Sequence, residues 1–153
     1  MEPKLVSREA FTVMGVAVRG NPAKLDYNDI WMSQFMAREA DIKPYSVDGA
    51  YYGAYFCTGQ EGLVDMIAGM AVEGVSDAPE GLVMREVPAA TYATFECTVG
   101  TIGPTWGTIE RWLAEGEYEW DHSKSDFEYY PPETAGEASP VTIYVGVRRK
   151  ATA

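Results

Sequence analysis

The sequence has 153 residues, of which 46% are hydrophobic and 23% charged, and its 23 acidic and 12 basic side chains give a formal net charge of −11. These values predict one soluble globular domain, 1–153, whose negative charge disfavours binding to the phosphates of nucleic acids. The sequence shows neither an apolar run of about 18 residues nor an N-terminal signal peptide, so we expect a cytoplasmic protein that contacts no membrane.

The first half of the chain predicts a strand, a helix and two further strands. A strand is expected over 13–18, where apolar and β-branched side chains dominate. The segment "YNDIWMSQFMARE" predicts a helix with Asp26 or Asn28 as its N-cap. Its helical period places five side chains near one face: Ile30, Trp31, Gln34, Phe35 and Arg38. Apolar runs predict the two further strands at 50–56 and 63–72.

The second half predicts the same order of elements. A strand over 90–99 is followed by "PTWGTIERWLAE", a helix with Pro104 in its opening turn. The apolar side chains of this helix recur at helical spacing: Trp106, Ile109, Trp112 and Leu113. Two more strands are expected, at 125–130 and 140–147.

A short repeat supports a duplication. The segments "LVSREAFTVMGVAV" at 5–18 and "LVMREVPAATYATF" at 82–95 share Leu, Val, Arg and Glu at an offset of 77 positions. A strand–helix–strand–strand unit cannot bury its own apolar face, so two copies should share one sheet. We therefore predict an α+β fold of two β-α-β-β repeats, about 4–75 and 81–149, with one antiparallel sheet, two main helices and a central groove. The alternative is a chance match within an unrelated α+β chain.

One carboxylate, Glu128, lies in the aromatic run "DFEYY". Aligning this run with "YYGAY" at 51–55 makes Gly53 the equivalent of Glu128, so one repeat has a charge where the other has no side chain. Strand alternation puts Asp126, Glu128 and Tyr130 on one face and Phe127 and Tyr129 on the other. Glu128 therefore either faces a groove between the repeats or faces water on an edge strand.

The groove interpretation has a defined chemistry. A carboxylate among aromatic rings loses hydration, which raises its pKa, and a bound organic cation would restore the charge balance. Each aromatic face adds an attraction of about 0.5–2 kcal/mol to a cation. Rings and one charge select ligands by class, which predicts broad binding of flat, hydrophobic cations.

Other reactive residues give weaker signals. Cys57 and Cys97 lie in apolar runs, and we expect both to be reduced, buried and inert. His122 is the one histidine and falls in the polar connector "EWDHSKSD", where a surface position is expected. No set of residues matches a zinc site, a Ser–His–Asp triad or a phosphate-binding loop, so we expect no metal and no cofactor.

The layout, the "TWGTIERWL" helix and the "DFEYY" and "VTIYVGV" strands together resemble the GyrI-like family of bacterial effector-binding domains. The resemblance implies an aromatic pocket in which Glu128, followed by Tyr130, meets lipophilic cations. It also implies that Tyr144 and Trp106 line this pocket and that either Tyr51 or Tyr52 contributes to it. Trp31 is a further candidate wall, although Trp31, Trp106 and Trp112 also suit the core, and Trp112 suits it best.

Three functions stay open at this point. The main expectation is a protein that senses or sequesters bulky aromatic cations, with Glu128 as the charge anchor. The alternative is a hydrolase of reactive, cyclopropane-type xenobiotics, as in some stand-alone relatives, with Glu128 as general acid or base. The third is inhibition of a DNA-acting protein through the acidic surface. We expect no DNA-binding helix-turn-helix within these 153 residues, so the resemblance is to the stand-alone members. The natural ligand and the oligomeric state are not encoded in these patterns.

Overall fold

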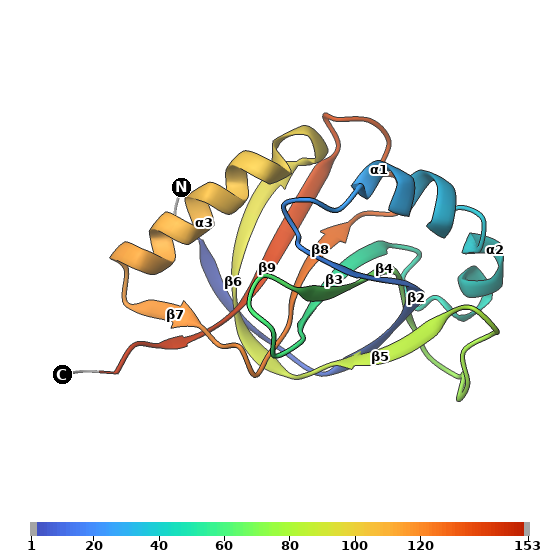
Figure 1. Ribbon diagram of the computed structural model, residues 1–153, viewed down its shortest axis with the longest axis horizontal. Coiled ribbons are helices and arrows are strands. Elements are labelled where there is room, and N and C mark those ends of the chain that lie inside the picture. The colour runs from blue at the N-terminus through green and yellow to red at the C-terminus, as the bar shows by residue number, and fades with distance from the viewer. Residues whose placement is uncertain (1–2, 152–153) are drawn as a thin grey trace.

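A computed structural model describes residues 3–151 and shows one curved antiparallel sheet with helices along one of its faces (Figure 1). The strands are β1 Lys4–Arg8, β2 Phe11–Gly20, β3 Tyr51–Cys57, β4 Val64–Val72, β5 Val83–Val87, β6 Ala90–Thr98, β7 Tyr118–Trp120, β8 Asp126–Tyr130 and β9 Pro140–Arg149. The α+β class and the single antiparallel sheet are confirmed. The predicted strands are all present, whereas β1, β5 and the short β7 were not expected from the sequence.

The strand order is symmetric about the centre of the sheet. It runs β1-β6-β9-β8-β3-β4-β2-β5, with β7 pairing with β9. The four strands β1, β2, β3 and β4 can be exchanged for β5, β6, β8 and β9 in turn. After this exchange the same order is obtained when the sheet is read from its other edge, as expected for a duplication. The central pair is β3 with β8, where Gly53 lies directly opposite Glu128. Each half is completed by an edge strand of the other, because β1 pairs with β6 and β5 pairs with β2.

The helix of the first half is irregular. It begins as α1 Tyr27–Asp29, continues as the π-helix η1 Ile30–Phe35, and is followed by α2 Glu39–Ile42 and the 3₁₀ turn η2 Lys43–Tyr45. The side chain of Asp26 accepts a 3.0 Å hydrogen bond from the Asp29 amide, which confirms one of the two predicted N-caps.

The π-turn changes which side chains are buried. It closes with a 3.2 Å bond from the Met36 amide to the Trp31 carbonyl, and Ile30 and Phe35, five residues apart, are the buried pair. The expectation that Gln34 lies on the buried face is wrong, because the wider turn rotates Gln34 into solvent.

The helix of the second half is regular. The 3₁₀ turn η3 Val99–Thr101 leads into α3 Ile102–Glu115, with Pro104 in its first turn. Ile109 and Leu113 are buried against the sheet, and Trp112 packs edge-on to Phe95. Within residues 3–151 no helix is long and apolar enough to cross a bilayer.

Three apolar clusters hold these layers together. One lies between the first helical segment and the first half of the sheet and is centred on Met14, Ile30, Phe35 and Met66. A second lies between α3 and the second half and includes Phe95, Ile109 and Ile143. The third occupies the opposite face of the sheet and is shared by both halves, with Tyr52, Tyr92 and Phe127 at its centre. The centre of the helix-covered face is therefore a junction between two separate cores.

Candidate functional site

Glu128 lies at this junction. It is in the middle of β8, which is hydrogen-bonded to β3 on one side and to β9 on the other, so it is not on an edge strand. Its side chain is on the helix-covered face and is only 2% exposed. The alternative of a solvent-facing glutamate is thereby excluded.

Three neutral donors hold the carboxylate. The Tyr130 hydroxyl donates to Oε1 at 2.8 Å, while the Tyr55 hydroxyl and the Trp106 indole N–H donate to Oε2 at 3.2 and 3.1 Å. Burial raises the pKa of Glu128, and these three hydrogen bonds oppose part of that rise. Burial and then the charge of Glu128 in turn raise the pKa values of Tyr55 and Tyr130 well above their ordinary range.

Gly53 makes space for the carboxylate. A Cβ atom at this position would lie 3.2 Å from Oε1 of Glu128 and 3.4 Å from both Met66 Cε and Trp31 Cζ2. A Cβ atom at position 53 would therefore crowd the carboxylate, while its contacts with Met66 and Trp31 would be at ordinary van der Waals distance. The glycine of one half thus accommodates the charge of the other.

Aromatic rings from both halves cover Glu128. Trp31, from η1, packs edge-on against Tyr130 with ring centroids 5.3 Å apart, and Trp106, from α3, packs edge-on against Tyr55 at 6.3 Å. All four rings are half-buried. The structure thus brings four rings around Glu128: the predicted Trp31, Trp106 and Tyr130, and Tyr55. Sequence reasoning missed Tyr55, although it lies two residues from Gly53 and so shares its face.

Tyr51 lies farther from the carboxylate on the same face. Its partner across the strands is Tyr130, its ring packs against Phe35, and its hydroxyl donates to Glu39 at 2.8 Å. Of the pair Tyr51 and Tyr52, Tyr51 is therefore the one on the Glu128 side.

The expectation that Tyr52 and Tyr144 share a pocket with Glu128 is wrong. Tyr52 pairs with Tyr129 and Tyr144 pairs with Phe127, which places both side chains on the opposite face of the sheet. There Tyr52 is 1% exposed, and Tyr144 stacks on Phe127 with centroids 4.4 Å apart.

The opposite face holds a cation of its own, which sequence reasoning also missed. The Arg8 guanidinium lies 4.5 Å from the Phe11 ring centroid, 5.1 Å from Phe127 and 5.5 Å from Tyr144. It donates a 3.2 Å hydrogen bond to the Tyr52 hydroxyl, which donates to Asp48 at 2.7 Å. This aromatic cluster is therefore already occupied.

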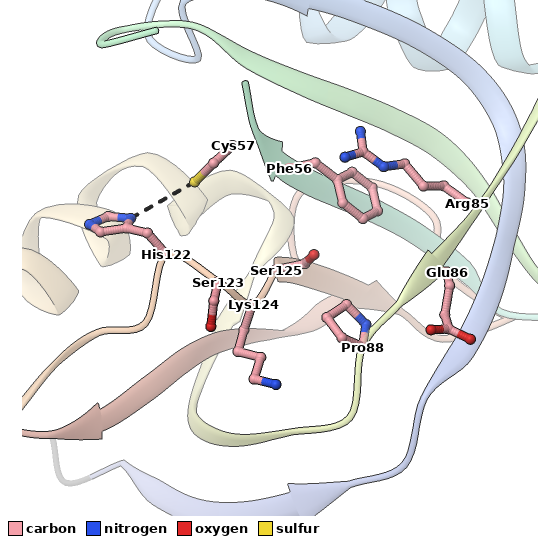
Figure 2. Close-up of a pocket in the computed structure, with 9 residues that line it drawn as sticks. All are labelled: Phe56, Cys57, Arg85, Glu86, Pro88, His122, Ser123, Lys124 and Ser125. Carbon is pink, nitrogen blue, oxygen red and sulfur yellow. Dashed lines mark hydrogen bonds between the residues drawn. The ribbon is translucent and has the colours of Figure 1, made fainter. Parts of the chain in front are cut away.

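The cysteines and the histidine differ in part from expectation. Cys57 is exposed rather than buried, and Cys97 is half-buried. The Cys57 thiol lies 3.8 Å from Nδ1 of His122, which is exposed on its connector as predicted (Figure 2). Within the described part of the chain, no three His, Cys, Asp or Glu side chains are grouped to hold a metal ion.

Comparison with protein families decides the assignment. The model of the integron-associated effector binding protein family, Cass2, matches residues 4–147. The chain belongs to this family. It is therefore an effector-binding domain, and the predicted membership of the GyrI-like group is confirmed.

Three known proteins illustrate the similarity. The transcriptional regulator BrlR of Pseudomonas aeruginosa is 30% identical over 154 residues, which cover 96% of this chain and 56% of BrlR, so the chain spans about half the length of that relative. The structure of SAV2435 bound to tetraphenylphosphonium superposes with a TM-score of 0.75 at 15% identity, over 97% of this chain and 94% of SAV2435. The integron cassette protein VCH_CASS2 of Vibrio cholerae gives 0.68 at 23% identity, over 97% of each chain. The two structures establish a shared fold.

Proposed function

We propose that this domain binds bulky aromatic cations in a groove between its two helical segments, with Glu128 as the charge anchor. The observation that carries the proposal is a buried carboxylate satisfied only by neutral donors. Among residues 3–151 no Lys, Arg or His forms an ion pair with Glu128. Its negative charge is therefore available to a ligand.

A lipophilic cation suits this environment better than a small hydrated one. Removing a carboxylate from water is costly unless a charge of opposite sign is brought to it. An organic cation is weakly hydrated and gains further from the faces of Trp31, Trp106, Tyr55 and Tyr130. The structure of SAV2435 with tetraphenylphosphonium supports this ligand class, because that protein shares the fold.

Access to the carboxylate requires a ring to move. Trp106 belongs to a 14-residue helix anchored by Ile109 and Leu113. Trp31 belongs to a six-residue π-helix flanked by short turns, whose Met32 and Met36 are exposed. A six-residue π segment is less stable than a regular α-helix as long as α3. We therefore propose that Trp31 and η1 move outward when the ligand enters, which uncovers Gly53 and Glu128.

The test is a tryptophan-fluorescence titration with tetraphenylphosphonium, beside the neutral triphenylphosphine oxide. Wild type should bind the cation saturably and more tightly than the neutral compound. Glu128→Gln should weaken cation binding by about 30-fold or more, the loss of at least about 2 kcal/mol expected for an unpaired buried charge. The matched control is Glu96→Gln, an exposed glutamate on β6, which should bind as wild type does. Equal binding of the cation by wild type and Glu128→Gln would refute the anchor role.

A second candidate function rests on the raised pKa of Glu128. A carboxyl group that stays protonated nearer to neutral pH, next to the Tyr130 hydroxyl, can act as a general acid toward a strained electrophile. If the domain is a hydrolase of this kind, the Glu128→Gln variant should lose all turnover of a cyclopropane-containing alkylator while still binding it. Absence of turnover by wild type under saturating conditions would exclude this candidate and leave the binding function.

A further inference from the structure

A second hollow lies away from Glu128, where the end of β3, the β5–β6 connection and the loop before β8 meet (Figure 2). Its volume is about 260 Å³. One wall is Phe56, which belongs to the apolar cluster on the face opposite Glu128. The hollow is therefore separate from the proposed cation site around Glu128, and any ligand it takes is independent of the proposed function.

The hollow is locally positive although the chain has a net charge of −11. Lys124 lines it and forms no ion pair within the described residues 3–151. Arg85 lies over the Phe56 ring at 4.0 Å and 3.4 Å from Asp65. That aspartate is held more closely by Arg19, at 2.7 Å, so the charge of Arg85 is only partly compensated.

A serine hydroxyl also lines the hollow. Ser125 is 4% exposed, but among residues 3–151 no fully buried side-chain oxygen or nitrogen lacks a hydrogen-bond partner. A hydroxyl that lines a hollow can donate a hydrogen bond to a ligand oxygen there. Ser125 follows Lys124 directly, and both belong to the loop before β8.

The remaining walls restrict the size and charge of the ligand. Phe56 and Pro88 offer apolar surface, which suits a hydrocarbon body. Glu86 also lines the hollow. A fixed negative charge in the wall disfavours phosphates and other polyanions more than a single carboxylate.

We propose that this hollow is a second binding site, for small monocarboxylates with an apolar body. The carboxylate lies against the Lys124 ammonium and the Ser125 hydroxyl, and the body packs against Phe56 and Pro88. The domain would then take ligands of opposite charge on its two faces.

The test is a titration followed by amide chemical shifts, with benzoate as the probe and neutral benzamide as its isostere. Benzoate should produce saturable shifts around residues 56–57 and 122–125, and benzamide should not. Lys124→Gln should weaken benzoate binding about tenfold, and Ser125→Ala by a smaller factor, in line with lost charged and neutral hydrogen bonds. Lys43→Gln, an exposed lysine in η2, and Glu128→Gln should both retain full benzoate affinity.

Three outcomes would overturn the proposal. These are the absence of saturable benzoate shifts, equal binding of benzamide, and equal loss of affinity in Lys124→Gln and Lys43→Gln. Retained binding in Glu128→Gln separates this site from the aromatic groove, so the two proposals can fail independently. Both lysine substitutions are at incompletely buried side chains, and their amide spectra report directly that the variants are folded.

Discussion

The two faces of the central β3–β8 pair carry aromatic clusters of opposite design. On the helix-covered face, rings surround the Glu128 carboxylate, which forms no ion pair with a cation of residues 3–151. On the other face, rings surround the Arg8 guanidinium, which the chain itself supplies from β1. Both faces use alternate residues of the same strands. The comparison teaches that an aromatic cluster alone does not identify a ligand site, because the cluster around Arg8 is filled by a cation of the fold itself.

The largest expected effect concerns stability of the occupied face. Phe127 is fully buried there, and Phe127→Ala should lower the free energy of unfolding by about 3–5 kcal/mol, because it leaves a cavity among four rings. Trp31→Ala, on the helix-covered face, should cost clearly less, since this ring is half-buried. Urea denaturation measures both values. Equal costs would remove the distinction between a closed and an open cluster.

The pH dependence of stability should come from the helix-covered face. Burial raises the pKa of Asp126 to about 7, against hydrogen bonds from the Gly146 amide and the Trp120 indole. Between about pH 4 and 7 the unfolded carboxyl ionises while the folded one stays protonated, so stability falls as the pH rises through this window. At about 1.4 kcal/mol per pKa unit, the loss approaches roughly 4 kcal/mol.

The measurement for this pH effect is the urea midpoint at pH 4.5 and at pH 7.5. Asp126→Asn should flatten the difference, because the substituted side chain does not titrate. Glu96→Gln, at an exposed carboxylate, should leave it unchanged. A wild-type midpoint that rises across this window would contradict the assignment.

A smaller effect is expected from the internal cation. Arg8→Met removes the guanidinium from its rings and its hydrogen bond to Tyr52, which should cost about 1–2 kcal/mol of stability. Tetraphenylphosphonium affinity should stay within about threefold of wild type, because the substitution is on the opposite face. Lys4→Met, an exposed cation on the same strand, is the control for loss of a positive charge. Tighter cation binding by Arg8→Met would show instead that the emptied cluster takes ligand.

The smallest effect concerns the pKa of Glu128, which burial raises and the hydrogen bond from Tyr130 lowers. Tyr130→Phe removes the 2.8 Å hydrogen bond to Oε1 of Glu128, so the pKa of the carboxyl should rise further. The proposed anchor role requires a charged Glu128, so cation affinity in this variant should begin to fall at a higher pH than in wild type as the pH is lowered. Titrations from pH 5 to 8.5 measure the shift. Tyr129→Phe, on the same strand but the other face, should follow the wild-type curve.

Local patterns in the sequence were sufficient for the strands and for the strand that carries Glu128. Alternation placed Asp126, Glu128 and Tyr130 on one face, as the structure shows, because the side-chain direction within one strand depends only on the backbone pleat. The internal repeat also gave Gly53 as the equivalent of Glu128, and the structure adds that the two residues pair across β3 and β8. The sequence match that begins at Leu5 and Leu82 was less accurate about which residues are equivalent. In the sheet register, the β5 residue equivalent to Lys4 of β1 is Val83, a shift of two residues from that match.

The sequence alone therefore determined the α+β class, the order of the main elements and a glutamate among aromatic residues in the chain's second half. Only the tertiary structure decided which rings surround that glutamate. Which residues of neighbouring strands share a face of the sheet depends on the strand register, a non-local property. Tyr52 and Tyr144 therefore lie on the other face of the sheet from Glu128, whereas Tyr55 lies on the same face. Likewise, Arg8 reaches its rings only because β1 pairs with a strand of the other half, a contact between residues far apart in the sequence.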